Sequence, residues 1–150
     1  MADSLIVKIS NLSKSFGSFT VLNDISIDIE RGENLVVFGR SGSGKSVLLK
    51  CTVGLLKPDE GTITINEKAI NKISLKELNE VRKEIGFLFQ GAALYDSMSV
   101  RENLQFPLKR HFDMTQKEMD DKTISTLEMV SLADAVDKMP SELSGGMRKR

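Results

Sequence analysis

The sequence predicts an α/β fold, and three observations support this prediction. First, the apolar run at 34–38 has no polar alternation, which is typical of a buried strand. Second, the glycine-rich segment GRSGSGKS at 39–46 follows this run directly and leads into an apolar segment, expected to be a helix packed on a sheet. Third, the β-branched, alternating runs at 5–9 and 25–29 predict strands with one solvated face.

Further strands and turns follow in order along the chain. KPDEG at 57–61 predicts a turn, and TITI at 62–65 predicts the strand after it. We expect the strands before residue 34 and the strand at 62–65 to form a small antiparallel layer beside the main sheet. The run at 85–89 is apolar throughout and predicts a second buried strand.

Three helices are predicted by one capping signature, Ser or Thr followed three residues later by Glu. They begin after Ser74, Ser99 and Thr115. The first is expected to reach about Lys83, and Pro107 is expected to end or kink the second. The third has a helical stripe made of Met119, Thr123, Leu127 and Val130.

The length of 150 residues suits one domain, which we expect to divide near Gln90 into a strand-rich part, 1–90, and a helical part, 91–150. Lys plus Arg equals Asp plus Glu at 21 each, which predicts no nucleic-acid partner. No apolar run approaches the roughly 20 residues that span a bilayer, and the start does not resemble a signal peptide. We therefore expect a cytoplasmic chain without direct membrane insertion, in which Cys51 is a small buried hydrophobe.

The segment 39–46 fits the phosphate-binding pattern GxxxxGK[ST] at every fixed position. Its glycines permit backbone N–H groups to turn toward an anion, and the following helix N-terminus favours negative charge. Lys45 suits the β- and γ-phosphates, and the Ser46 hydroxyl suits Mg²⁺. A chance glycine-rich turn is the alternative, which the flanking strand and helix disfavour. We predict a nucleoside triphosphate site formed by Gly39, Arg40, Ser41, Gly42, Ser43, Gly44, Lys45 and Ser46.

Two later positions carry weaker signals. Gln90 follows a predicted buried strand, where an amide can reach a metal or a water, although alone it is better interpreted as an ordinary loop residue. In LSGGM at 143–147, Ser144, Gly145 and Gly146 begin a predicted helix and form a second candidate phosphate-binding N-terminus. The alternative for this segment is a serine N-cap followed by a flexible glycine hinge.

In this order and spacing, GRSGSGKS, Gln90 and LSGGM resemble the nucleotide-binding domain of an ABC transporter over all 150 residues. The resemblance implies a P-loop NTPase (RecA-like) core with an antiparallel β layer and a helical subdomain. It implies ATP and Mg²⁺ as ligands, Lys45 and Gln90 as catalytic residues, and Gln90 in contact with Mg²⁺ and the attacking water. It also implies that Phe16 stacks on adenine, with a core position as the alternative, and that Val21 lies beneath the ribose.

In the ABC family two domains meet head to tail, so the resemblance implies a homodimer joined by ATP. Ser144 and Gly146 would contact the γ-phosphate bound by the other copy, and hydrolysis would let the dimer open. The stretches at 81–108 and 139–150, with Met147 where most of the superfamily has Gln, resemble the ATPase of Mla/Mce-type lipid transporters of bacterial envelopes. This implies a transmembrane permease contacted by 91–98 and by the helix after Ser99, phospholipid cargo, and a peripheral position on the cytoplasmic face of the inner membrane.

The sequence departs from the family pattern after LSGGM. No apolar run ending in Asp-Glu follows, so the family's Mg²⁺-binding aspartate, catalytic glutamate and switch histidine have no counterpart in 1–150, and His111 cannot take the last role. We therefore predict a fragment whose C-terminal part is missing and which alone has little or no ATPase activity. The alternatives are an ATP-binding module without hydrolysis and a soluble ABC protein without a permease. A kinase or GTPase would leave LSGGM unexplained.

Overall fold

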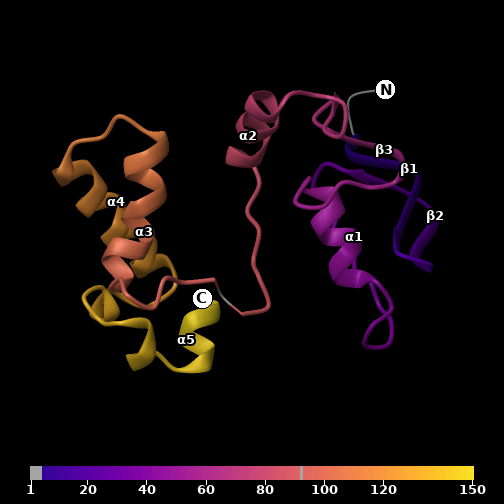
Figure 1. The fold of residues 1–150 in the computed structure, drawn as a ribbon. Coiled ribbons are helices and arrows are strands. Elements are labelled where there is room, and N and C mark those ends of the chain that lie inside the picture. The colour runs from indigo at the N-terminus through magenta and orange to yellow at the C-terminus, as the bar shows by residue number, and fades with distance from the viewer. Residues whose placement is uncertain (1–4, 92) are drawn as a thin grey trace. The chain divides into compact units, whose positions relative to one another are not determined.

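The computed structural model describes residues 5–91 and 93–150 of the chain. These fold as two compact units that divide between Gly86 and Phe87 (Figure 1). We call the part before this division unit 1 and the part after it unit 2. The assignment of residues 1–90 and 91–150 to a nucleotide-binding core and a helical subdomain stays a prediction.

Unit 1 contains a four-stranded antiparallel sheet in the order β2-β1-β3-β4. Its strands are β1 (Leu5–Phe16), β2 (Phe19–Glu30), β3 (Glu60–Ile65) and β4 (Lys68–Ala69). The antiparallel layer is thus confirmed, but β1 and β2 are longer than expected. Irregular register allows the hairpin to continue through polar sequence: Asn11 and Asp24 adopt positive φ, and the Asn11 side-chain amide donates to Asp24 Oδ1 at 2.8 Å.

Two helices of unit 1 contribute residues to the core that covers the sheet, α1 (Lys45–Thr52) and α2 (Leu75–Lys83). Cys51 is fully buried there, and burial raises the pKa of its thiol, as expected for a small core residue. The buried members of this core are Ile9, Leu12, Leu22, Leu48, Cys51, Ile63, Ile65, Ile70 and Val81.

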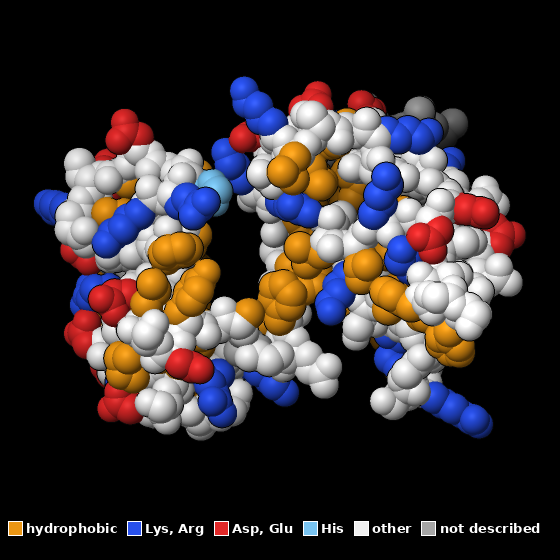
Figure 2. Space-filling model, viewed as in Figure 1, with side chains coloured by type: hydrophobic (Ala, Val, Ile, Leu, Met, Phe, Trp, Pro, Cys, Tyr) orange, Lys and Arg blue, Asp and Glu red, His pale blue; other side chains and the backbone are white. Residues whose placement is uncertain are grey.

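The apolar runs at 34–38 and 85–89 are not strands, so both predictions of a buried strand are wrong for this chain. Phe38 is 89% exposed and Leu88 is 67% exposed. A buried parallel strand needs ladder partners and cover on both faces. In the described part of the chain, the only strands pair in the antiparallel sheet and none pairs with either run. Apolar side chains consequently lie at the surface of both units (Figure 2).

Unit 2 is helical and contains α3 (Val100–His111), α4 (Gln116–Met129), two short 3-10 turns at Ala133–Ala135 and Pro140–Glu142, and α5 (Gly145–Lys149). The capping boxes at Ser74, Ser99 and Thr115 are all formed, which confirms the three predicted helix starts. In the α4 stripe three residues are buried and Val130 is half-buried. Helix α3 continues past Pro107, so of the two expected outcomes, an end or a kink, the end does not occur.

A network around Arg101 connects α3 and α4 to the segment that precedes Ser144. The Arg101 guanidinium contacts Asp120 at 3.0 Å and Asp137 at 2.9 Å. The backbone N–H of Arg101 also donates to the Val136 carbonyl oxygen at 2.8 Å. These contacts, with the packing of buried Leu143 in the unit 2 core, hold the approach to α5.

Among the described residues, no helix has the length and apolar character that crossing a membrane requires.

Candidate functional site

The loop at 39–44 is folded around the side chain of Lys45, the first residue of α1. The Lys45 ammonium donates to the carbonyl oxygens of Gly39 at 2.7 Å and Arg40 at 2.8 Å. Within the loop, the Ser43 N–H donates to the Arg40 carbonyl oxygen at 3.2 Å. The positive charge is therefore held inside the turn, beside the N-terminus of α1, where it would meet an anion bound by the helix N–H groups.

Glycine is required at Gly44 by both conformation and space. Its φ is +90°, and a Cβ there would lie 2.9 Å from Val21 Cγ1 and 3.0 Å from the Val21 carbonyl oxygen. At Gly39 an added Cβ would lie 2.6 Å from Ser43 Oγ. The structure thus brings Val21 of β2 against the base of the loop. Val21 and the loop at 39–46, both predicted to contact the nucleotide, therefore meet in unit 1.

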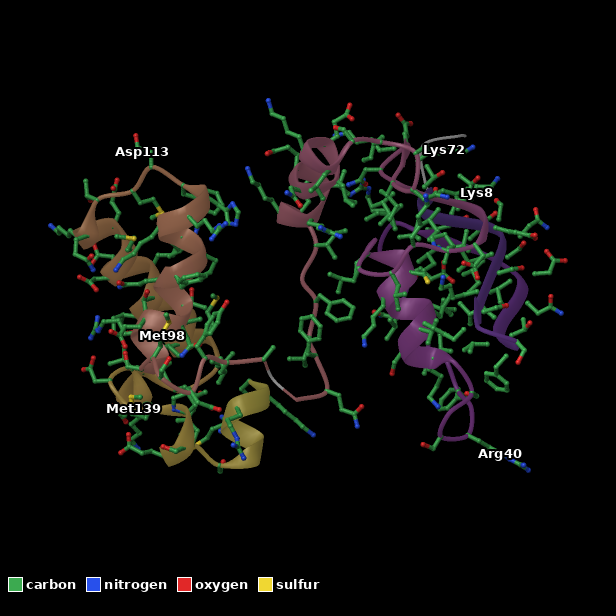
Figure 3. All side chains as sticks on the ribbon, in the orientation of Figure 1. Lys8, Arg40, Lys72, Met98, Asp113 and Met139 are labelled. Carbon is green, nitrogen blue, oxygen red and sulfur yellow. The ribbon has the colours of Figure 1, made fainter. Side chains whose placement is uncertain are left out.

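The remaining predicted loop residues present groups to solvent. Ser41, Ser43 and Ser46 are exposed, and the Arg40 side chain extends away from the loop (Figure 3). An ammonium, helix N–H groups and hydroxyls form a donor set that fits phosphate oxygens, and the Ser46 hydroxyl fits a hard cation such as Mg²⁺. The residues present therefore suit a magnesium-bound phosphate chain.

Phe16 lies at the end of β1, beside the turn that leads into β2. Its side chain is 49% exposed, so the alternative that Phe16 belongs to the core is wrong. The ammonium of Lys14 lies 5.5 Å from the centroid of the Phe16 ring. Lys14 in turn contacts Asp59 Oδ1 at 2.7 Å, and the Ser15 N–H donates to Asp59 Oδ2 at 2.7 Å. These two hydrogen bonds hold the pKa of Asp59 below its usual range.

Lys14 and Asp59 are not among the site residues that the sequence predicts. Asp59 lies in KPDEG, which predicts only a turn, and the turn does not reveal which strand its carboxylate will meet. The proximity of Lys14 to Phe16 at i and i+2 was a usable signal, because residues two apart in a strand lie on the same face.

Unit 2 carries the other predicted site residues. Gln90 is exposed in a turn and does not end a buried strand, since 85–89 is not a strand. The rings of Phe87 and Phe89 before it contact each other edge to face with centroids 4.7 Å apart. His111 is exposed at the end of α3, as expected of a surface residue.

Ser144 is the N-cap of α5, and its hydroxyl accepts from the Met147 N–H at 3.2 Å. The predicted helix start is therefore confirmed. Gly145 and Gly146 are exposed: a Cβ on Gly145 would meet nothing within 4 Å, and one on Gly146 would meet only Ser144 Oγ at 3.9 Å. Helix α5 contains no buried residue. This N-terminus consequently faces open space.

Comparison with known proteins gives consistent matches. A model of the family described as ABC transporter matches residues 22–150. The chain is 43% identical over 150 residues to the "Probable ribonucleotide transport ATP-binding protein mkl" of Mycobacterium leprae (strain TN), covering 100% of this chain and 43% of that protein. It is 42% identical over 147 residues to "Protein TRIGALACTOSYLDIACYLGLYCEROL 3, chloroplastic" of Arabidopsis thaliana, covering 97% of this chain and 42% of that protein. The chain therefore spans less than half the length of these curated relatives.

Among solved structures, the chain resembles the dimeric post-hydrolysis state of the ATP-binding cassette MJ0796 bound to ADP and Pi. The TM-score is 0.86 with 31% identity, over 95% of this chain and 65% of that chain. This likeness confirms the predicted fold class, an α/β P-loop NTPase fold with an antiparallel layer and helices.

Proposed function

We propose a function from one premise, which is that this chain belongs to the ABC transporter family. It is the ATP-binding portion of an ATPase subunit that drives a transmembrane permease. The observation that carries this proposal is the position of Lys45, whose ammonium is held by two loop carbonyl oxygens at the N-terminus of α1. A triphosphate is the ligand that such a charge beside helix N–H groups fits best.

Each predicted site residue of unit 1 has a distinct part in ATP binding. Lys45 pairs with the β- and γ-phosphates, the N–H groups at the start of α1 donate to phosphate oxygens, and Ser46 offers its hydroxyl to Mg²⁺. Phe16 stacks on adenine and Val21 lies beneath the ribose. The bound cation would neutralise charge on the phosphates.

The unit 2 residues act on two different nucleotides of the proposed dimer. Gln90 contacts Mg²⁺ and positions the attacking water. Ser144, Gly145 and Gly146 contact the γ-phosphate held by a second copy, so that ATP joins a head-to-tail homodimer. The open space around Gly145 and Gly146 supports this role, because an approaching phosphate would meet exposed backbone N–H groups there. The dimeric state of the similar cassette supports it as well.

For residues 1–150 taken alone, we propose ATP binding with little or no turnover. The subunit to which this chain belongs would hydrolyse ATP while peripheral to the cytoplasmic face of the inner membrane.

Phospholipid is the proposed cargo, on the resemblance of 81–108 and 139–150 to lipid-transport ATPases. The Arabidopsis relative carries the name of a galactosyl glycerolipid, which supports a lipid cargo without a bearing on a phosphate headgroup. Ribonucleotide is the second candidate, because the mycobacterial relative is named for ribonucleotide transport. A transport assay with the permease partner separates the two cargo candidates. A phospholipid transporter should move phospholipid between vesicles, whereas a ribonucleotide transporter should move ribonucleotide across a membrane.

Titration calorimetry with Mg²⁺ and ATP tests the binding step. We expect Lys45→Ala to weaken ATP binding by about 100-fold or more, because it removes a charge-assisted contact to phosphate. Lys50→Ala is the matched control, since Lys50 is exposed on the same helix, and it should leave affinity unchanged. Equal affinity in Lys45→Ala and the parent chain would reject the phosphate site.

A further inference from the structure

We propose that the Lys14–Asp59 ion pair is a positioning device for base recognition: it places Lys14 over one face of Phe16 and leaves the other face for the nucleotide base. Lys14 and Asp59 are positioning residues here, and Phe16 is the residue that touches the ligand. The inference deepens the proposed ATP site and rests on it.

Asp59 holds the strand just before the aromatic ring at three consecutive residues. Its carboxylate accepts from the Lys14 ammonium and from the Ser15 N–H, each at 2.7 Å. Its own backbone N–H donates to the Ser13 carbonyl oxygen at 3.0 Å. The end of β1 is therefore fixed from the 57–61 turn, a segment more than forty residues further along the chain.

The ion pair is unlike a freely hydrated surface pair. The Lys14 side chain is only 13% exposed, whereas that of Asp59 is 48% exposed. A lysine this covered has few alternative positions, so it loses little further freedom on pairing. Both carboxylate oxygens of Asp59 are used, one by the ammonium and one by a backbone N–H, which fixes the orientation of the carboxylate.

The consequence for Phe16 follows from the direction of the ammonium. At 5.5 Å from the ring centroid, Lys14 lies within the range of a cation–π contact. One ring face is then occupied, and the half-exposed ring can receive a planar base on its other face. Base stacking on an aromatic side chain contributes about 5- to 150-fold in affinity. If the Phe16 ring tilted after loss of the Lys14 contact, part of this gain in affinity would be lost.

The ring is also tied to the phosphate loop through its own hairpin. Ser15 Oγ hydrogen-bonds Thr20 Oγ1 at 3.1 Å across the turn, and the next residue, Val21, packs against Gly44. All of these residues belong to unit 1. The spacing between the base-stacking ring and the phosphate loop is thus set within one compact unit.

A purely structural role for the ion pair is the competing explanation, and two ligands separate it from base positioning. Titration calorimetry would compare Mg²⁺-ATP with Mg²⁺-tripolyphosphate, which lacks the base and ribose. We expect Lys14→Met and Asp59→Asn to weaken ATP binding about 5- to 20-fold and to leave tripolyphosphate binding within about twofold. Lys14→Arg, which keeps the charge, should restore most of the ATP affinity.

The control is Lys8→Met, since Lys8 is an exposed lysine on the same strand (Figure 3), and it should change neither affinity. A parallel loss for both ligands, or an unchanged ATP affinity, in the folded Lys14 and Asp59 variants would overturn the proposal. Should Lys14→Met fail to fold, Asp59→Asn keeps the side-chain shape and decides the question. Phe16→Ala separates a failure of the base-stacking proposal from a failure of the phosphate site. If Phe16→Ala leaves ATP affinity unchanged while Lys45→Ala removes binding of both ligands, base stacking on Phe16 is wrong and the phosphate site is retained.

Discussion

The chain begins two helices with a glycine-bearing loop, and the surroundings of these loops are opposite. Before α1, Gly44 is buried against Val21 and the loop is closed around Lys45. Before α5, the loop ends at the N-cap Ser144, and the first two residues of the helix, Gly145 and Gly146, are exposed in open space. The first loop is completed by residues of its own unit, whereas the second presents free backbone outward. The same residue type therefore serves close packing in one loop and access in the other.

Substitution at Gly44 should have the largest effect. Gly44→Ala places a Cβ at φ +90° and 2.9 Å from Val21 Cγ1, so we expect a loss of about 2–4 kcal/mol in unfolding free energy. The displaced loop should also lose ATP binding by more than about 100-fold. Urea unfolding and ATP titration measure the two effects. A variant with parent stability and affinity would mean that Val21 does not confine the loop.

Gly146→Ala should sharpen the contrast, because the same change meets no clash there. We expect an unfolding free energy within about 0.5 kcal/mol of the parent and unchanged ATP affinity. ATP-dependent dimerisation of the ATPase subunit should nevertheless weaken by about tenfold, because the added methyl group obstructs the partner's γ-phosphate. Analytical ultracentrifugation with and without ATP would detect this. Unchanged dimerisation would argue against a shared nucleotide.

Removal of the α5 cap should have a smaller and local effect. Ser144→Ala deletes the acceptor for the Met147 N–H, a change that costs about 0.5–2 kcal/mol at a typical helix start. Because α5 is short and has no buried residue, we expect fraying of this helix without unfolding of unit 2. Hydrogen exchange should show faster exchange at Met147 and unchanged exchange in α4. Faster exchange throughout α4 would instead indicate that α5 supports the unit.

Acidification should have the weakest and most distributed effect. Hydrogen bonds from Ser99 and Thr115 lower the pKa values of Glu102 and Glu118 in unit 2, as Ser74 does for Glu77 in unit 1. A carboxyl whose pKa is lower in the folded state stabilises that state above its unfolded pKa, and this stability is lost as pH falls through the folded pKa. We therefore expect the melting temperature of these helices to begin to fall as pH enters the ordinary carboxyl range and to stop falling below the folded-state pKa values. Thermal circular dichroism should show a smaller change in melting temperature with pH in Glu118→Gln than in the parent chain. An equal change would mean that Glu118 does not contribute to the pH dependence.

Local patterns were predicted correctly where neighbours in sequence supply the interaction. Ser74, Ser99 and Thr115 each cap a helix with a glutamate three residues away, so the partners are encoded side by side. The fold of the loop at 39–44 is local in the same way, since Lys45 reaches carbonyl groups five and six residues before it, and its phosphate-binding role stays a prediction. The runs at 34–38 and 85–89 failed because strand formation needs partners that no local pattern supplies.

The sequence by itself determined the family and the starts of the helices, and it predicted a phosphate site at 39–46, because each depends on residue types at short, fixed spacing. Only the tertiary structure decided that Gly44 packs on Val21, that Asp59 holds Lys14 against Phe16, and that Gly145 and Gly146 face open space. Those contacts join segments distant in the chain. Their geometry depends on sheet register and on helix placement, and neither can be predicted from a single local segment of the sequence.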